Sequence, residues 1–185
     1  MIYRSIQSIE EKYSLPALAL VRQVFTEHES PEEGKIVGAL VEEIRSKPFY
    51  LPPLELIALS DEQEVIGYAM FSRFHLEGKY QDDLLLLSPV AVKTSCQRQH
   101  ISKDLLEYGF EKAREMGFSA VLVEGNPANY RSRGFITAAH QGILPGKSVH
   151  LPHIDCLMVK ELRPGALETI QGTVEYDCYQ TLMAE

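Results

Sequence analysis

This sequence has few cysteines, no long apolar run and no excess of basic residues. The three cysteines are widely spaced and form no Cys-x-x-Cys pair or Cys/His cluster, which excludes a recognisable zinc site and favours reduced thiols (Cys96, Cys156 and Cys178). No apolar run approaches the roughly 20 residues that a membrane helix requires. We therefore expect no metal and no membrane-embedded segment.

The charge balance is acidic, with 18 Lys and Arg against 26 Asp and Glu and a formal net charge of -8. Broad nucleic-acid binding depends on neutralising phosphates with basic side chains, so this class of partner is not expected. An acidic surface suits a cationic or amine substrate. The first residues lack the apolar stretch of a signal peptide, and we expect a cytoplasmic protein.

A length of 185 residues and a hydrophobic fraction of 45% are typical of one globular domain, here residues 1–185. Periodicity and turn residues predict strands and helices in the order β, α, α, β, β, β, α, β, short α, β, β. The expected helices cover 15–25, 36–44 and 102–116, with a short helical turn in 126–133 and a polar connection at 26–31. The expected strands cover 2–7, 54–59, 64–74, 82–92, 119–124 and 156–162.

The strand over 82–92 is nearly continuous in apolar residues, which is typical of a strand buried on both faces. Pro89 interrupts it, and because proline cannot donate to a sheet ladder, it predicts a bulge or a splayed edge. The strand, helix and strand over 84–124 imply a right-handed crossover with local parallel pairing. The fold class is therefore α+β, or mixed α/β.

The turn at 97–102 joins this strand to the clearest helix, which Ser102 is expected to cap and Gly117 to end. The first N–H groups of a helix have no intrahelical partner and lie at the positive end of its dipole, so the turn can bind an anion such as a diphosphate. On topology alone, an ordinary strand-to-helix turn is the alternative.

The residues around this turn resemble motif A of the GNAT superfamily of N-acetyltransferases, through Ser88-Pro89-Val90-Ala91-Val92 and then Gln97-Arg98-Gln99-His100-Ile101-Ser102. Tyr130, Gly134 and Phe135 match the Y-x-x-x-G-F pattern of motif B. The tail over 158–167 and 172–176 is similar to the YhbS-like branch of predicted acetyltransferases. The resemblance implies the GNAT acyl-CoA N-acyltransferase fold, a central mixed sheet with a splayed parallel strand pair flanked by helices.

This resemblance also implies acetyl-CoA as co-substrate, with the pantetheine arm on the strand backbone and the diphosphate on the turn. The cofactor-binding residues it implies are Val90, Ala91, Val92, Gln97, Arg98, Gln99, His100, Ile101, Ser102, Lys103, Asn126 and Tyr130. Arg98 and Lys103 could add charge-assisted contacts to phosphate or could simply be solvated. His100 departs from the family, because glycine usually stands there and tolerates unusual backbone angles.

The resemblance places Tyr130 near the CoA sulfur, where its phenol could protonate the leaving thiolate, although a tyrosine can also serve only in packing. Glu124 is a candidate general base at a strand end. Glu27, His28, Glu29 and Asp83 are candidate substrate-binding residues, with solvated loops or strand ends as the alternative.

Three functions remain open from the sequence. The first is an N-acetyltransferase that transfers an acetyl group to an amine of a small molecule or peptide, by direct attack in a ternary complex, since no covalent nucleophile is evident. The second is a catalytically weak GNAT-fold protein that binds or senses acyl-CoA, suggested by His100. The third is an interaction protein without either property. A homodimer formed through the C-terminal strand is also possible.

Overall fold

The structure is a computed structural model that describes residues 4–183. Backbone contacts group the chain into two compact units: unit 1 comprises Met1–Phe71 and Pro89–Glu111, and unit 2 comprises Ser72–Ser88 and Lys112–Glu185. The single domain expected over residues 1–185 stays a prediction. None of the helices within residues 4–183 combines the length and the apolar character needed to cross a bilayer.

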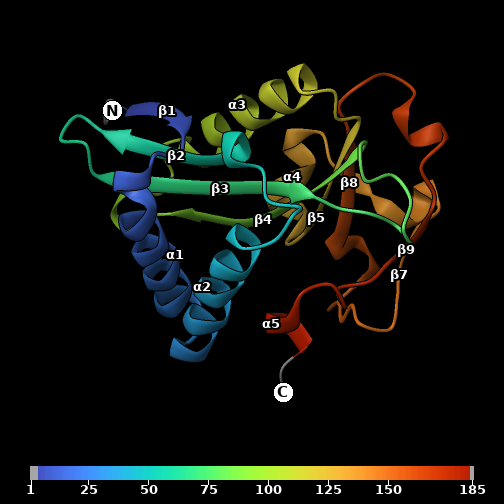
Figure 1. The fold of residues 1–185 in the computed structure, drawn as a ribbon, viewed down its shortest axis with the longest axis horizontal. Coiled ribbons are helices and arrows are strands. Elements are labelled where there is room, and N and C mark those ends of the chain that lie inside the picture. The colour runs from blue at the N-terminus through green and yellow to red at the C-terminus, as the bar shows by residue number, and fades with distance from the viewer. Residues whose placement is uncertain (1–3, 184–185) are drawn as a thin grey trace. The chain divides into compact units, whose positions relative to one another are not determined.

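Unit 1 contains an antiparallel sheet in the order β1-β2-β3, which continues to the last part of β4. The strands are β1 (Arg4–Ser8), β2 (Glu55–Ser60), β3 (Val65–Arg73) and β4 (Leu84–Val92). The helices are α1 (Ser14–His28), α2 (Pro31–Arg45) and α3 (Ile101–Glu115). Only α3 extends beyond unit 1, because its residues from Lys112 onward belong to unit 2. Figure 1 shows α3 on one face of β3 and the α1–α2 pair on the other, which explains why every residue of β3 except Arg73 is buried.

The α1–α2 pair differs from the expectation at its connection. α1 extends through Thr26 to His28, and α2 begins at Pro31. The predicted bounds of the polar connection, 26–31, were therefore wrong, because the connection contains only Glu29 and Ser30. Ser30 caps α2 by accepting a hydrogen bond from the Glu33 N–H at 3.1 Å, with Pro31 in the first turn. The two helices then approach closely: a Cβ on Gly34 would lie 2.0 Å from the Thr26 hydroxyl oxygen.

The packing of α3 on β3 also depends on glycine. A Cβ on Gly109 would lie 2.3 Å from Cε2 of Phe71, and a Cβ on Gly67 would lie 2.8 Å from Cγ2 of Ile101. Neither contact is possible for a larger residue without movement of an aromatic ring or of the helix start. Gly67 therefore allows the first turn of α3 to approach the sheet, and Gly109 does the same about two turns further along the helix.

Unit 2 contains the first part of β4 and the strands β5 (Ala120–Glu124), β8 (Leu157–Glu161) and β6 (Ile136–Thr137), in that order. The β4–β5 pair is parallel, as predicted, and its register runs from Leu84↔Ala120 to Leu86↔Leu122. The ladder ends two residues before Ser88, which agrees with the irregularity expected at Pro89. The other pairs of this sheet are antiparallel.

A second, two-stranded sheet of unit 2 pairs β7 (Ile143–Pro145) with β9 (Gly172–Val174) in parallel. β6 and β7 were not predicted, because two or three residues are too short to show an alternating pattern. The C-terminal strand β9 thus pairs within its own chain. Two short helices complete the unit, α4 (Pro127–Tyr130) and α5 (Gln180–Met183).

Candidate functional site

The turn before α3 has an unusual backbone. Arg98 and His100 have φ angles of +61° and +62°, in the left-handed region that favours glycine. His100 is followed by Ile101, the first residue of α3, and such an alternation of left- and right-handed residues turns successive N–H groups toward one side. The turn therefore enters the helix N-terminus with His100 in a left-handed conformation, and binding of an anion here stays a prediction.

This geometry changes the interpretation of His100. The sequence suggested a weak CoA site because histidine replaces the usual glycine; in the structure its backbone is left-handed and its imidazole is exposed. Histidine is among the residues enriched in this region. The cost is energetic, about 1–2 kcal/mol for a left-handed residue with a Cβ.

The side chains of the turn take different places. Ile101 is 1% exposed and packs toward Gly67, so only its backbone can meet a ligand. Ser102 is the second helical residue, and its predicted role as N-cap was wrong, because the left-handed His100 starts the helix one residue earlier. Nζ of Lys103 lies 3.9 Å from Oε1 of Glu107, which is one helical turn further along α3. Gln99 is half-buried, and its amide oxygen has no hydrogen-bond partner within residues 4–183.

Val90, Ala91 and Val92 form the last part of β4 in unit 1, and their burial alternates: Ala91 is buried and both valines are half-buried. Beyond the strand, the Lys93 N–H donates to the carbonyl of Ile66 at 2.9 Å, so this part of the chain still follows β3. The β4–β5 register has already ended at Leu86. One backbone edge of the three residues is therefore not used by that ladder.

The end of α1 contacts the segment that leads into the turn. Glu27 accepts a hydrogen bond from the hydroxyl of Thr94. Thr94 is the first residue of the short 3-10 helix Thr94–Cys96. His28 Nε2 lies 3.2 Å from the Thr94 hydroxyl oxygen and 3.0 Å from Nε2 of Gln97. Hydrogen bonds from Thr94 and Gln23 lower the pKa of Glu27. Glu27 and His28 thus lie at the end of a helix rather than in a loop, and they contact the segment that leads into the turn at 97–102.

The two other candidate substrate residues lie elsewhere. Glu29 is an exposed residue at the C-terminal cap of α1, where its N–H donates to the carbonyl of Phe25. Asp83 precedes β4 in unit 2 and accepts a hydrogen bond from the hydroxyl of Ser119 at 3.1 Å. The Asp83 carboxyl therefore supports the start of the β4–β5 pair. A role in substrate binding stays a prediction for all four residues.

Tyr130, the candidate acid, ends α4 in unit 2. Its ring is half-buried and meets Phe135 edge-on, with centroids 5.6 Å apart. A Cβ on Gly125 would lie 2.7 Å from the Tyr130 ring, so glycine makes room for it. Desolvation raises the pKa of Tyr130, and the charge of Arg133 partly offsets this shift. Asn126 caps α4 by accepting a hydrogen bond from the Ala128 N–H at 3.0 Å.

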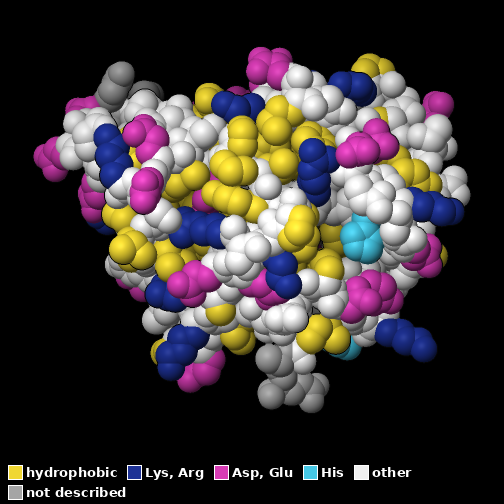
Figure 2. Space-filling view, in the orientation of Figure 1, with side chains coloured by type: hydrophobic (Ala, Val, Ile, Leu, Met, Phe, Trp, Pro, Cys, Tyr) yellow, Lys and Arg dark blue, Asp and Glu magenta, His cyan; other side chains and the backbone are white. Residues whose placement is uncertain are grey.

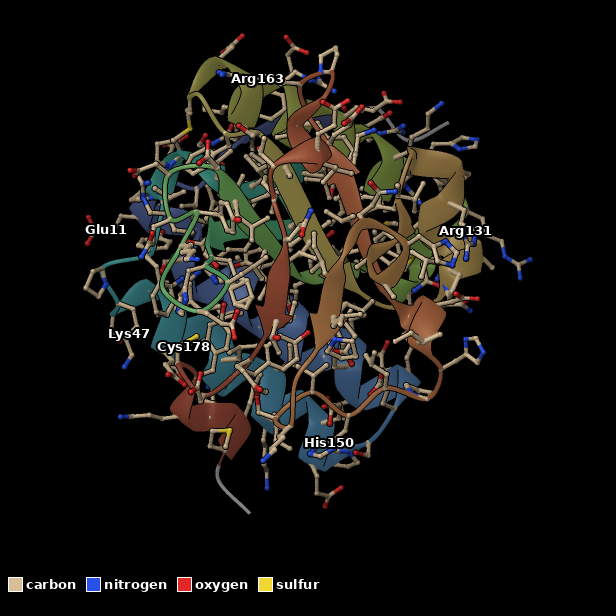
Figure 3. The ribbon with its side chains drawn as sticks, turned by 90° about the vertical axis from the view of Figure 1, so that its right-hand side faces the viewer. Glu11, Lys47, Arg131, His150, Arg163 and Cys178 are labelled. Carbon is tan, nitrogen blue, oxygen red and sulfur yellow. The ribbon has the colours of Figure 1, made fainter. Side chains whose placement is uncertain are left out.

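The motif B glycine, Gly134, has a φ of +88° and follows the turn that contains Arg131, which Figure 3 labels. This position therefore requires glycine for its backbone angle. A Cβ here would also lie 2.5 Å from Nζ of Lys160 on β8. The spacing from Tyr130 to Gly134 in the sequence thus reflects a left-handed turn directly after the tyrosine.

Glu124, the candidate base, ends β5 with an exposed side chain and accepts a hydrogen bond from the hydroxyl of Tyr176 at 2.8 Å. Burial, and then the charge and the hydrogen bond of Glu124, raise the pKa of Tyr176. Sequence reasoning assigned no role to Tyr176 or to Thr94. Tyr176 lies 52 residues from Glu124 in the sequence. The sequence singled it out only as part of the segment 172–176, which is similar to the YhbS-like branch.

Metal ligands do not gather in the described part of the chain: residues 4–183 contain no group of three or more His, Cys, Asp or Glu side chains able to hold an ion. Acidic and basic side chains are interspersed over the face that Figure 2 shows.

Residues 20–140 match the model of the acetyltransferase (GNAT) family. The chain belongs to this family. Among curated relatives of this GNAT chain is the uncharacterized N-acetyltransferase YhbS of Escherichia coli (strain K12), 34% identical over 163 residues, which are 85% of this chain and 87% of YhbS. A second, YjhQ of the same strain, is 28% identical over 133 residues, 71% of each chain.

Solved structures agree with this assignment. The structure of Escherichia coli YhbS in complex with CoA has a TM-score of 0.83 and 28% identity, and it covers 95% of this chain and 91% of its own. A GNAT family acetyltransferase from Brucella melitensis, in complex with acetyl-CoA, has a TM-score of 0.69 and 21% identity, covering 95% and 97%; at this identity it shows the fold alone. The GNAT fold and the resemblance seen in the sequence are therefore confirmed.

Proposed function

We propose that this GNAT protein is an acetyl-CoA-dependent N-acetyltransferase that transfers the acetyl group to an amine of a small molecule or peptide. The observation that carries the proposal is the left-handed backbone of Arg98 and His100 at the N-terminus of α3, a concavity of N–H groups suited to a diphosphate. The complex of the relative YhbS with CoA supports the same co-substrate.

The residues present fit the co-substrate. The turn offers backbone N–H groups without a metal, and the exposed guanidinium of Arg98 and ammonium of Lys103 can add charge-assisted contacts to phosphate. The backbone of Val90 to Val92 that the β4–β5 ladder does not use suits the amides of the pantetheine arm, which would pair with it like an added strand. His100 adopts a left-handed backbone, which is the kind of conformation that glycine permits, and its imidazole is exposed.

The proposed reaction is a direct attack in a ternary complex. The amine lone pair forms a bond to the acetyl carbonyl carbon, the carbon–sulfur bond breaks, and the thiolate takes a proton from the Tyr130 hydroxyl. Glu124 is proposed to remove the proton of the attacking amine, with Tyr176 orienting its carboxylate. Because desolvation raises the pKa of Tyr130, its phenol stays protonated at neutral pH and can act as the acid.

The acceptor class follows from charge. The net charge of -8 suits an amine that arrives as a cation, and Glu27, His28, Glu29 and Asp83 remain candidates for contacts to it. We also propose a cytoplasmic location, which agrees with three cysteines that form no disulfide.

The proposal is tested in two steps. Acetyl-CoA at millimolar concentration should raise the melting temperature, because a ligand that binds only the folded state stabilises it. Free CoA should then be released in the presence of an amine from a panel of small amines and peptide N-termini, measured by thiol titration. No melting shift would contradict co-substrate binding, and a shift without release of CoA across the panel would favour a binding protein instead.

Tyr130→Phe separates catalysis from binding. Loss of the proton donor should lower turnover by about 100-fold or more, the usual contribution of a general acid, while the dissociation constant of CoA stays the same. Tyr108→Phe is the matched control, since that exposed tyrosine on α3 has no assigned part in the reaction. Equal turnover in the wild type and Tyr130→Phe would remove Tyr130 from the mechanism.

A further inference from the structure

The turn that carries the diphosphate site contains two left-handed residues with side chains, Arg98 and His100. Each such residue costs on the order of 1–3 kcal/mol and persists only where its surroundings hold it. On the helical side, burial of Ile101 against Gly67 supplies this support. The side that leads out of β4 needs a support of its own.

Within unit 1, that support is the end of α1. Glu27 accepts the hydroxyl hydrogen of Thr94, and His28 Nε2 lies within hydrogen-bonding distance of both Thr94 and Gln97. Gln97 directly precedes Arg98, the first left-handed residue, and its side-chain amide nitrogen also lies 3.4 Å from the carbonyl oxygen of Val92. Two contacts between segments far apart in the sequence therefore lie just before the turn: Glu27 with Thr94, 67 residues apart, and His28 with Gln97, 69 residues apart.

The chemistry of these groups gives each contact a direction. Glu27 is ionised at neutral pH, because its pKa is lowered, and a carboxylate can only accept. Thr94 has one hydroxyl hydrogen and gives it to Glu27. The imidazole of His28 then either donates to the Thr94 oxygen or accepts from the Gln97 amide, according to its tautomer. With a hydrogen on Nε2, His28 restrains Thr94; without one, it restrains the Gln97 side chain.

We infer that Glu27 and His28 are positioning residues for the co-substrate: through Thr94 and Gln97 they hold the diphosphate turn in its binding conformation. This assigns them to the donor site, whereas the sequence pointed to the amine acceptor. The inference rests on the proposed function, since it requires CoA to bind at this turn. It predicts that the two residues affect affinity for the diphosphate part of CoA without touching the ligand themselves.

The test compares dissociation constants for CoA by calorimetric titration. Thr94→Val, His28→Ala and Glu27→Ala should each weaken CoA binding by about three- to tenfold, the equivalent of one ordinary hydrogen bond. Thr94→Ser keeps the hydroxyl and should stay within about twofold of the wild type, as should the exposed controls Glu32→Gln and His140→Gln. Pantetheine, which has no diphosphate, should bind equally to the wild type and the three variants.

The outcomes separate the two ideas. If the wild type does not bind CoA, the proposed function fails. If the wild type binds CoA and the three variants bind it equally well, the positioning role is wrong while the function stands. The role is also wrong if Thr94→Ser is as weak as Thr94→Val, or if pantetheine affinity falls in the same proportion, since either result indicates general damage to the protein.

Discussion

Glu55 provides the sharpest test of what stabilises unit 1. This carboxylate at the start of β2 is 1% exposed, and it is surrounded by partners from three other segments. Nε of Arg45 at the end of α2 lies 2.8 Å and 3.2 Å from its two oxygens, and the hydroxyls of Tyr50 and Tyr68 both donate to it. Removing Glu55 would leave a guanidinium of low exposure without its counter-charge.

The substitution Glu55→Leu keeps a similar volume and removes all of these acceptors. Breaking a buried ion pair by loss of one partner costs about 3–5 kcal/mol, a large share of the 5–15 kcal/mol by which a typical domain is stable. For a chain of this length, about 2–4 °C is lost per kcal/mol, so the melting temperature should fall by roughly 6–20 °C. The double variant Glu55→Leu/Arg45→Met should recover part of the loss, since no unpaired charge remains.

Urea unfolding followed by circular dichroism measures the effect. The matched control is Glu42→Gln, which breaks the surface pair with Arg22, whose atoms lie 3.1 Å apart and whose side chains are both about half exposed. That change should cost less than about 1 kcal/mol. A free energy of unfolding for Glu55→Leu within about 1 kcal/mol of the wild type would refute the reasoning, as would a double variant that is less stable than the single one.

Three further predictions address the backbone and the titrating groups. His100→Gly should stabilise the protein by up to about 1 kcal/mol, since relief of left-handed strain exceeds the added chain entropy, and thermal melts with CoA titration should show unchanged affinity. Gly134→Ala should cost about 1–2 kcal/mol in urea unfolding because φ is +88°, while Lys160 can move aside; an unchanged midpoint would contradict the left-handed turn. The pKa values of Tyr68 and Tyr176 are raised, so their contribution to stability is complete below pH 10 and is lost as pH rises above it. Unfolding measured from pH 7 to 11 should therefore weaken above pH 10, and less steeply in Tyr176→Phe; equal slopes would exclude Tyr176 as a cause.

Local patterns in the sequence determined most of the fold. The apolar run of β4, the periodicity of α1 to α3 and the spacing of Tyr130 and Gly134 each arise from neighbouring residues, because helix and strand periods are local properties. The family motifs are local for the same reason: a diphosphate turn is built from a strand end and a helix start that adjoin in the chain. The resemblance to the GNAT family rested on such segments, and the match of residues 20–140 to the family model confirmed it.

Tertiary structure decided which side chains meet. Glu27 meets Thr94, and Glu124 accepts a hydrogen bond from Tyr176. Glu55 is buried among Arg45, Tyr50 and Tyr68. No local sequence pattern predicts any of these contacts. Hydrogen bonds between distant segments depend on how the strands and helices pack, so no spacing rule in the sequence encodes them. His100 illustrates both levels: its identity departs from the family pattern, whereas only the structure shows that its backbone is left-handed.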